Sequence, residues 1–382
     1  MHDLIQAIIN LNALRHNLAR IRAMADRAEV MAVVKADAYG HGALRVARTL
    51  AQEGVRRFAV ARIEEGVKLR DEGIDGSILV LGAPLPHQLP LYARHSLGIT
   101  VSSSEVLEAV LKLSPSLSEP LETHVKIETG MGRIGISPQR AAGAVERLDG
   151  ATGIDLASVW THLATADEPD SAFVEKQLAI FDETVFPFRD AVAYVHVANS
   201  AALLNHSDKL DLSEGTVIRP GIALYGLSPS GTTDQALAAG LRPVMTLVST
   251  ITHVKEVAEG ESVSYSRKWR AASPRRIATI AAGYADGYPR RLTNRAEVGI
   301  DGRRFPVAGT VCMDMTMADL GSSNGPAAIR PGTTATLFGG DGPSCFELAR
   351  LAETITYEIV CQVGARVPRV YCCDVTGKDD RT

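Results

Sequence analysis

Lys35 is the residue of this 382-residue sequence with the clearest chemical potential. It ends an apolar run and precedes residues 36–42, whose sequence Ala-Asp-Ala-Tyr-Gly-His-Gly indicates a turn. A lysine at the mouth of a buried strand is costly unless its charge is paired or used. Burial favours the neutral amine, which attacks carbonyl groups, and pyridoxal phosphate is the commonest aldehyde held in this way, as a Schiff base. A lysine whose ammonium reaches solvent from the strand end explains the same segment equally well.

Other polar and cationic residues follow the ends of later apolar runs. The fifth run ends in Lys126 to Arg133, the sixth in His162, the seventh in Asn199 and Ser200, and the eighth in Arg219 to Ile222. Barrel enzymes place their active-site groups where strands end, and often bind phosphate with the last two loops. Ser200 can donate a hydroxyl, and Gly221 allows close approach of backbone N–H groups. A phosphate site and Lys35 together indicate pyridoxal phosphate.

The elements that would position these residues alternate along the first part of the chain. Eight short β-branched runs lie near 31–36, 57–61, 77–82, 97–101, 123–128, 154–161, 193–198 and 215–219. Helical patterns separate them; Leu14, Leu18 and Ile21 share one face, and Ser104 is the expected cap of a later helix. This α/β order predicts a TIM-like (β/α)8 barrel over residues 1–235. An open doubly wound sheet is the alternative, although no GxGxxG follows the first strand.

The pattern changes after residue 226. Alternating strand patterns at 245–251 and 276–280 are separated by glycine-rich turns at 301–302 and 339–342. Such spacing predicts a mostly-β C-terminal domain, which we place at residues 236–382.

Bulk properties exclude several classes of function. The net charge is −4 with no basic tract, so nucleic acid is not an expected partner. No run approaches the roughly 18 apolar residues of a membrane span, and the amino terminus lacks a signal-peptide pattern. The five cysteines form no CxxC pair, which suggests neither a disulfide framework nor a metal site. A reducing cytoplasm is the expected compartment.

Nine segments of the sequence, in order from about residue 7 to 371, resemble the alanine racemase family of fold-type III pyridoxal-phosphate enzymes. They are Val-Val-Lys-Ala-Asp-Ala-Tyr-Gly-His-Gly, Lys-Ile-Glu-Thr-Gly-Met-Gly-Arg-Ile-Gly, Trp-Thr-His-Leu-Ala-Thr-Ala-Asp, His-Val-Ala-Asn-Ser-Ala, Ile-Arg-Pro-Gly-Ile-Ala-Leu-Tyr-Gly, Val-Ser-Tyr, Gly-Tyr-Ala-Asp-Gly-Tyr-Pro-Arg, Val-Cys-Met-Asp and Thr-Ile-Thr-Tyr-Glu. The resemblance implies L-/D-alanine interconversion, D-alanine supply for peptidoglycan, and a homodimer whose active sites are shared between subunits.

The resemblance also implies a role for each motif residue. Lys35 is similar to the Schiff-base lysine, and Arg219 to the partner of the pyridine nitrogen. The implied phosphate ligands are Tyr39, Ser200, the backbone amides of Gly221 and Ile222, and Tyr357, while His162 and Asn199 resemble other residues of the cofactor pocket. An arginine stays protonated and disfavours protonation of that nitrogen, so the ring becomes a weaker electron sink.

On the substrate side, Arg133 resembles the residue that faces the carboxylate, and Tyr284 and Met313 resemble gate residues. Lys126 is similar to a lysine often carbamylated in the family. Racemisation exchanges protons on both faces of one Cα, which two opposed bases accomplish without crossing its plane. The resemblance gives Lys35 the D-face and Tyr265, from the partner subunit, the L-face.

The sequence departs from the family pattern at two positions, and three alternative functions remain open. Asp37 stands where asparagine is common, and Ser266 where glycine is common, so the loop after Tyr265 could differ. A serine or broad-specificity racemase is one alternative, although such relatives tend to carry a smaller polar group than Tyr357. An amino-acid decarboxylase would bring a cysteine in place of Tyr265. A non-catalytic cofactor-binding protein would resemble the barrel alone.

Overall fold

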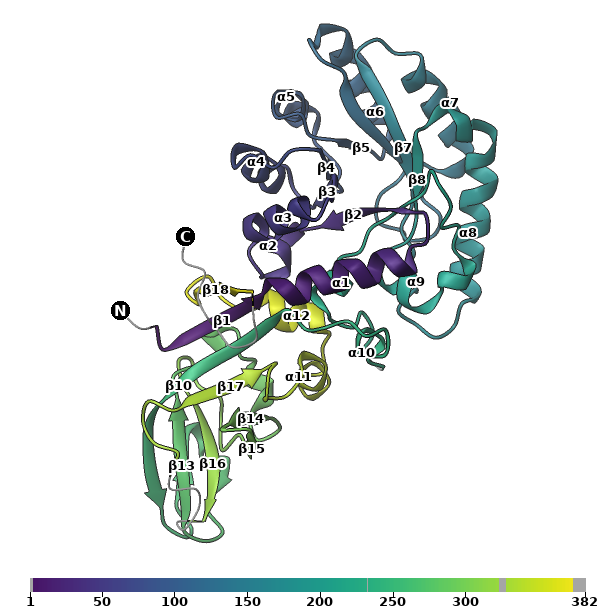
Figure 1. Cartoon of the computed structure of the whole chain (residues 1–382). Helices are drawn as coiled ribbons and strands as arrows, with labels where there is room; N and C mark the ends of the chain where they lie inside the picture. Colours follow the sequence, from purple (N-terminus) through teal and green to yellow (C-terminus); the bar gives the residue numbers. More distant parts are fainter. Residues whose placement is uncertain (1–2, 232, 323–327, 374–382) are drawn as a thin grey trace. The chain divides into compact units, whose positions relative to one another are not determined.

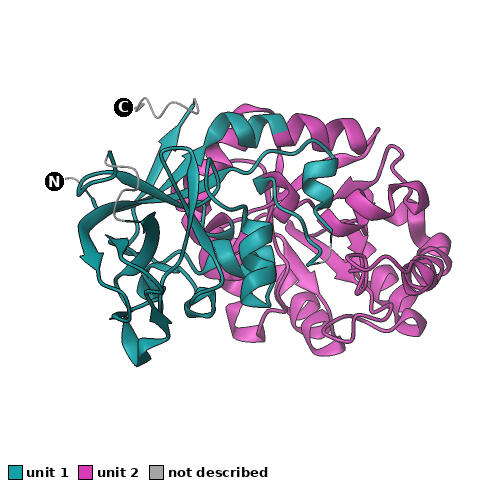
Figure 2. Ribbon diagram, turned by 90° about the horizontal axis from the view of Figure 1, so that it is seen from below, with its two compact units in different colours: residues 1–16, 39–41, 225–382 teal, residues 17–38, 42–224 magenta. Residues whose placement is uncertain are grey.

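The structure of the chain, a computed structural model, describes residues 3–231, 233–322 and 328–373 (Figure 1). It divides into two compact units. Unit 1 comprises residues 1–16, 39–41 and 225–382, and unit 2 comprises residues 17–38 and 42–224 (Figure 2). In the described part, no helix combines the length and apolar character that crossing a membrane would require.

Unit 2 is built on eight parallel strands. One four-stranded sheet has the order β4 (Ser77–Val80), β3 (Arg57–Val60), β2 (Glu29–Val33) and β9 (Val217–Ile218); the other has the order β5 (Ile99–Val101), β6 (Leu121–Lys126), β7 (Ile154–Trp160) and β8 (Tyr194–His196). Single parallel bridges, Leu79 to Gly98 and Val195 to Thr216, join the two sheets into a ring. Every strand lies at one of the eight predicted runs, and the barrel is confirmed.

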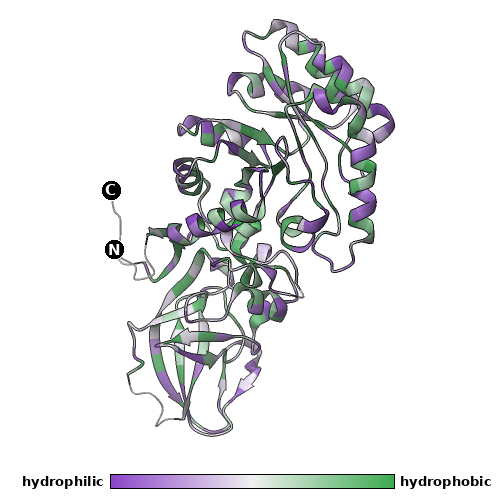
Figure 3. Cartoon of the chain, turned by 45° about the vertical axis from the view of Figure 1, so that its right-hand side comes forward, coloured by the Kyte–Doolittle hydropathy of each residue, from purple (hydrophilic) through white to green (hydrophobic). Residues whose placement is uncertain are grey.

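Helices follow the strands around the ring. They are α3 (Ala43–Gln52), α4 (Ile63–Asp71), α5 (Leu89–Arg94), α6 (Ser104–Leu113), α7 (Pro138–Asp149), α8 (Ala172–Val185) and α9 (Ser200–Asn205), with α1 (Leu11–Met24) before β2. In α7 the buried residues Ala141, Ala144, Val145 and Leu148 form one stripe, and the helices carry both hydrophilic and hydrophobic bands (Figure 3). The expected cap of α6 was wrong by one residue, because Ser103 Oγ, rather than Ser104, accepts the N–H of Val106.

Unit 1 is mostly β, as predicted. Its main sheet has the order β15 (Arg303–Pro306), β14 (Glu297–Ile300), β17 (Thr334–Phe338), β10 (Met245–Val257), β1 (Ile5–Asn10) and β18 (Arg369–Cys372). Strand β13 (Arg275–Ile280) pairs with β10 and with β16 (Thr316–Ser322), and β11 (Ser262–Val263) pairs with β12 (Trp269–Arg270). The amino-terminal β1 runs antiparallel to β10 and parallel to β18, so both ends of the chain share this sheet.

Unit 1 contains a small hydrophobic core. It contains Val257, Val263, Ala271, Ile277, Ala308 and Met317, with Trp269 and Cys312 packed against it. The remaining helices among the described residues are α2 (Lys35–Tyr39), α10 (Gln235–Ala238), α11 (Cys345–Ala352) and α12 (Thr356–Cys361). Short 3-10 turns lie at Pro86–Gln88, Ser114–Ser116, Phe186–Ala191, Ser207–Lys209, Ile222–Tyr225, Tyr265–Arg267, Tyr284–Asp286 and Arg290–Leu292.

Candidate active site

Lys35 begins a turn of left-handed helix. Residues 36–39 all have φ between 52° and 54°, and none of them is glycine. A left-handed conformation costs an L-residue roughly 1–2 kcal/mol, so four in succession need strong support from their surroundings. Strained backbone of this kind concentrates at functional sites. The half-buried Lys35 therefore leaves β2 on a segment whose shape is imposed by the fold.

Acidic side chains hold this turn in place. Asp37 Oδ1 accepts the N–H of Ala43 at 2.8 Å, and Asp37 O accepts the N–H of Gly42 at 2.9 Å. Glu65 Oε1 accepts the N–H of Ala36 at 2.6 Å. Asp37, one of the two departures from the family pattern, thus performs a capping role for the start of α3.

Four cations surround the imidazole of His162. Desolvation and then the charges of Arg219, Arg133, Lys35 and Lys126 lower the pKa of His162 to about 2. The ring is therefore neutral at any physiological pH, and the mouth of the barrel carries a concentrated positive field. Such a field favours anionic groups, and the structure here brings together five of the residues singled out from the sequence.

Lys126 is fully buried beneath this field. Its Nζ donates to Ile134 O at 2.7 Å and lies 5.2 Å from the centroid of the Trp160 ring. Desolvation lowers the pKa of Lys126 to about 8, with Arg219 and Arg133 acting in the same direction and Glu128 opposing them. Roughly a tenth of Lys126 is therefore neutral amine at pH 7, far more than for a lysine of ordinary pKa.

Arg219 directly follows β9 and is buried, with only 3% of its surface exposed. Its guanidinium donates to His196 Nδ1 at 2.9 Å and to His196 O at 2.7 Å. It also donates to Thr161 O at 2.8 Å and Val197 O at 3.1 Å. Desolvation lowers the pKa of Arg219 to about 9, which leaves it a cation at neutral pH. The rigid plane of the guanidinium is thus held in place by residues at the ends of β7 and β8.

The loops after β8 and β9 meet at Ser200. Ser200 Oγ accepts the N–H of Gly221 at 2.8 Å and the N–H of Ala223 at 3.2 Å. The cap of α9 is Asn199, whose Oδ1 accepts the N–H of Ala202. The Ser200 hydroxyl consequently keeps its own proton available for another acceptor.

Tyr39 and Tyr357 lie together within unit 1. Their ring centroids are 5.9 Å apart, and Tyr39 also packs against Tyr225 at 5.1 Å. His41 stacks on Tyr225 at 4.5 Å, and its Nδ1 lies 2.9 Å from Tyr39 O. The four rings form one aromatic cluster, in which His41 supports the tyrosines.

Tyr265 and Met313 line a cavity of about 520 Å³ in unit 1. Tyr265 is 70% exposed and Met313 is 52% exposed, which is unusual for large side chains of this kind. Ser264, Ser266 and Arg267 beside Tyr265 all have positive φ, at 69°, 62° and 50°. Ser266, the second departure from the family pattern, therefore adopts the left-handed region, which glycine enters without steric cost.

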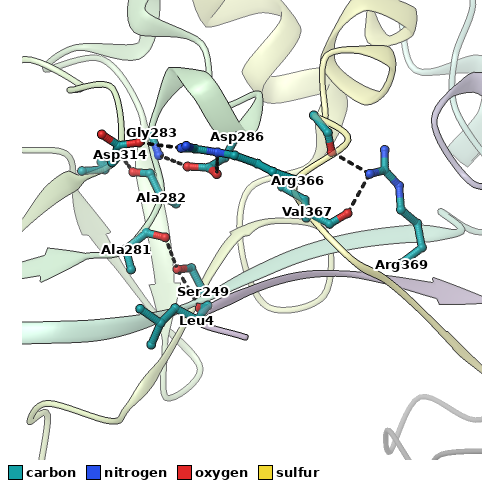
Figure 4. A network of polar contacts seen from close by, with 12 residues as sticks. Leu4, Ser249, Ala281, Ala282, Gly283, Asp286, Asp314, Arg366, Val367 and Arg369 are labelled. Carbon is teal, nitrogen blue, oxygen red and sulfur yellow. Dashed lines mark hydrogen bonds and ion pairs between the residues drawn. The ribbon is translucent and has the colours of Figure 1, made fainter. Parts of the chain in front are cut away.

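Arg366 joins the loop of Tyr284 to the loop of Met313. It donates to Asp286 Oδ1 at 2.8 Å and to Asp314 Oδ1 at 2.7 Å (Figure 4). The backbone N–H groups of Tyr284 and Ala285 donate to the carbonyls of Cys312 and Met313, each at 3.0 Å. A Cβ at Gly283 would lie 2.3 Å from Cys312 O, so only glycine permits this approach. The two expected gate residues thus sit on loops that are fixed to each other.

Comparison with known proteins gives one consistent result. The family model "Alanine racemase, N-terminal domain" matches residues 9–229, and "Alanine racemase, C-terminal domain" matches residues 244–371. The chain belongs to the alanine racemase family. The alanine racemases of Chlorobaculum tepidum and Geobacter sulfurreducens are each 41% identical over 376 residues, covering 96% of this chain and 95% and 96% of those proteins.

Solved alanine racemase structures have the same fold. That of D-cycloserine-producing Streptomyces lavendulae has a TM-score of 0.89 at 32% identity, over 98% of this chain and 99% of its own. The biosynthetic enzyme of Pseudomonas aeruginosa has a TM-score of 0.86 at 36% identity, over 97% of this chain and 100% of its own. Both domains of the alanine racemase architecture are thus present.

Two residues that were not predicted from the sequence, Glu128 and Gln177, support this alanine racemase site from behind rather than forming its surface. Glu128 Oε1 accepts the N–H of Gly130 at 2.6 Å and helps fold the loop that carries Arg133. The fully buried Gln177 donates to His162 O and Thr129 Oγ1, each at 3.1 Å. An acidic residue before a glycine turn was a usable signal for Glu128. Nothing in the pattern of α8 marks Gln177 as different from other helical polar residues.

Proposed function

We propose that this protein is an alanine racemase that interconverts L- and D-alanine with pyridoxal 5'-phosphate. The observation that carries the proposal is the positive field around His162 at the mouth of the barrel, with Lys35 among its sources. Membership of the alanine racemase family over nearly the whole chain supports the same reaction. D-alanine formed in this way would supply peptidoglycan synthesis, and the cysteine pattern favours the cytoplasm.

The donor set suits pyridoxal 5'-phosphate. A primary amine at Lys35 matches its aldehyde, and the cationic field matches its phosphate. Ser200, Gly221, Ile222, Tyr39 and Tyr357 are the proposed phosphate ligands, His162 and Asn199 the proposed neighbours of the ring, and Arg219 the proposed partner of the ring nitrogen. When bound, the cofactor supplies an electron sink that makes the Cα proton of an amino acid acidic.

The chain's own residues would then orient the substrate and move its proton. Arg133 pairs with the alanine carboxylate. Lys35 Nζ exchanges a proton with Cα on the D-face, and Tyr265 Oη of the partner subunit exchanges one on the L-face. Arg219 remains protonated and would therefore disfavour a proton on the ring nitrogen, so that the bound cofactor would be a weaker electron sink.

Lys126 is proposed to carry a carbamate. The lowered pKa of Lys126, about 8, makes its amine available to add to CO₂, with release of one proton. The product is an anion next to Arg133, replacing a repulsive pair of cations with an attractive one. Tyr284 and Met313 are the proposed gate to this part of the site.

A second copy of the chain is proposed as the partner. Four of the large exposed side chains of unit 1, namely Tyr265, Tyr284, Met313 and Met315, are 42–70% exposed in one chain. A neighbouring subunit would cover them and receive Tyr265. Under this proposal, residues 1–235 hold the cofactor and residues 236–382 complete the partner's site.

The test is deuterium exchange at Cα in a panel of L-amino acids, with added pyridoxal 5'-phosphate. We expect exchange and inversion with alanine, and no release of CO₂. Lys35→Ala should lose both the visible absorbance of the bound cofactor and all inversion. Release of CO₂ would indicate a decarboxylase, and inversion of serine as fast as alanine would indicate broad specificity. Racemisation by Lys35→Ala without the visible band would overturn the assignment of Lys35.

A further inference from the structure

A single file of polar side chains leads away from Arg219 inside the barrel. We use "the file" for its members, which are His196, Ser158, His124 and Glu122. His196 Nδ1 accepts from Arg219 at 2.9 Å, and His196 Nε2 lies 2.8 Å from Ser158 Oγ. Ser158 Oγ lies 2.7 Å from His124 Nδ1. His124 Nε2 faces Glu122 Oε1 at 3.3 Å, which is close enough for attraction although the two atoms are not aligned as a hydrogen bond.

Strand register places these side chains in one file. His124 of β6 is paired with Ser158 of β7, and Glu122 and His124 are alternate residues of β6 that share a face. His124 and Ser158 are fully buried, and His196 is 1% exposed. A Cβ at Gly98 would lie 2.8 Å from His124 Nε2, so the neighbouring strand leaves room for this ring only because it has glycine there. The file is thus a built feature of the barrel core.

The chemistry of the two ends gives the file a direction. A guanidinium can only donate, so His196 Nδ1 must accept. Desolvation, together with Arg219, holds the pKa of His196 well below its usual range, so this ring is neutral and carries its proton on Nε2. Ser158 Oγ accepts the hydrogen bond from this N–H group. Its own hydroxyl group can then donate a hydrogen bond to His124 Nδ1. The proton of His124 then lies on Nε2, toward the carboxylate of Glu122.

The far end is anchored in a second set of contacts. Ser77 Oγ donates to Glu122 Oε1 at 2.5 Å. Desolvation raises the pKa of Glu122, but the contacts with His124, Ser77 and Arg57 outweigh it and hold that pKa below its usual range. Glu122 is therefore an anion at neutral pH, and the file connects a buried cation to a carboxylate at the opposite end.

We propose that Glu122, His124, Ser158 and His196 form a hydrogen-bond relay of one fixed polarity that positions Arg219. Hydrogen-bond dipoles that are aligned in this way and end on a carboxylate stabilise a guanidinium that burial would otherwise disfavour. The effect on the cofactor rests on the proposed function, because it acts through Arg219 on the ring nitrogen. The four are positioning residues, since they act through Arg219.

Neutron diffraction from deuterated crystals of the loaded enzyme tests the polarity directly. We expect deuterium on Nε2 and none on Nδ1 of both His124 and His196, with the Ser158 hydroxyl directed at His124 Nδ1. Deuterium on Nδ1 of either ring, including a doubly protonated His124, would overturn the relay. This measurement requires no activity and no altered residue.

Ser158→Ala tests the positioning role in solution. Its matched control is Ser114→Ala, which removes another buried hydroxyl of unit 2 that donates only to Leu111 O at 3.3 Å. Ser158→Ala should shift the visible band of the bound cofactor and lower kcat for alanine about tenfold, with KM little changed. Ser114→Ala should do neither. Glu122→Gln, at the partly exposed end, should shift the band in the same direction with the barrel core intact.

The two proposals fail in different ways. Normal racemisation and an unshifted band in Ser158→Ala and Glu122→Gln would contradict the relay alone. A chain with neither band nor racemisation would contradict the proposed function, and a neutron map from its crystals without cofactor would still decide the polarity.

Discussion

The ionisation of Lys126 predicts how the stability of the protein should depend on pH. Its folded-state pKa is about 8, whereas an unfolded chain restores about 10.5, so the unfolded state binds more protons between these values. Burial of the charged ammonium group therefore destabilises the folded state fully below pH 8, and this destabilisation is relieved as the pH rises to 10.5. The free energy of unfolding should therefore rise through this window by on the order of 3 kcal/mol relative to Lys126→Met.

Urea unfolding in CO₂-free buffer measures this difference. Lys176→Met, at an exposed position of α8, is the control and should follow the parent chain. Added bicarbonate should remove the pH dependence if Lys126 becomes a carbamate. An identical pH profile for Lys126→Met and the parent would show that burial does not lower this pKa.

Tyr265 gives a directional prediction. Tyr265→Phe removes the phenol oxygen while keeping the ring, so it should slow removal of the L-alanine Cα proton by roughly 10² or more. Proton removal from D-alanine, assigned to Lys35, should be much less affected. Single-turnover deuterium exchange from each enantiomer measures both. Equal losses in the two directions would contradict the assignment of faces.

At the scale of elements, the sequence predicted what its local pattern determines. All eight barrel strands lie at β-branched runs because burial on both faces requires continuous apolar residues. The left-handed turn at residues 36–39 was not predicted, since it contains no glycine and depends on distant contacts such as Glu65. Nor was the pairing of β1 with β10 and β18, because pairing across most of the chain leaves no local signal.

The turn at Tyr265–Arg267 offers a test of backbone strain. Ser266 has φ 62°, so Ser266→Gly should relieve steric cost and raise the free energy of unfolding by about 0.5–1 kcal/mol after the entropy of glycine is counted. Ser273→Gly, in an exposed loop without positive φ, should instead be neutral or destabilising. Denaturant unfolding compares the two. Destabilisation by both to the same extent would mean that Ser266 is not strained.

At the scale of the whole molecule, shared sites can be tested by mixing two inactive variants. Lys35→Ala and Tyr265→Phe each damage both sites of a homodimer. In a mixed dimer one site receives both lesions and the other receives neither. Random exchange of equal amounts makes half the dimers mixed, so activity should return to roughly a quarter of the parent value. No recovery after verified subunit exchange would indicate that each site is built from one chain.

The site itself was predictable as far as its motifs extend. Lys35, Arg133, His162 and Arg219 could be named because family segments mark them, and in the structure the charges of the three cations converge on the neutral His162. The residues behind them, such as Ser158 and Gln177, could not be named from sequence. A buried serine or glutamine acquires its role from partners on other strands, and those partners are known only once the barrel closes.

Arg219 occupies a joint of the barrel. Strands β8 and β9 are connected by single bridges, Val195 to Thr216 and Asn199 to Arg219, and β4 and β5 by the single bridge Leu79 to Gly98, whereas the other neighbouring barrel strands share ladders. The Arg219 guanidinium spans this joint by donating to the carbonyls of Thr161, His196 and Val197. The group proposed to set the electronics of the reaction is therefore also a fastener of the fold. Exchanging it for an acid, to gain a stronger electron sink, would also remove three hydrogen bonds across this joint.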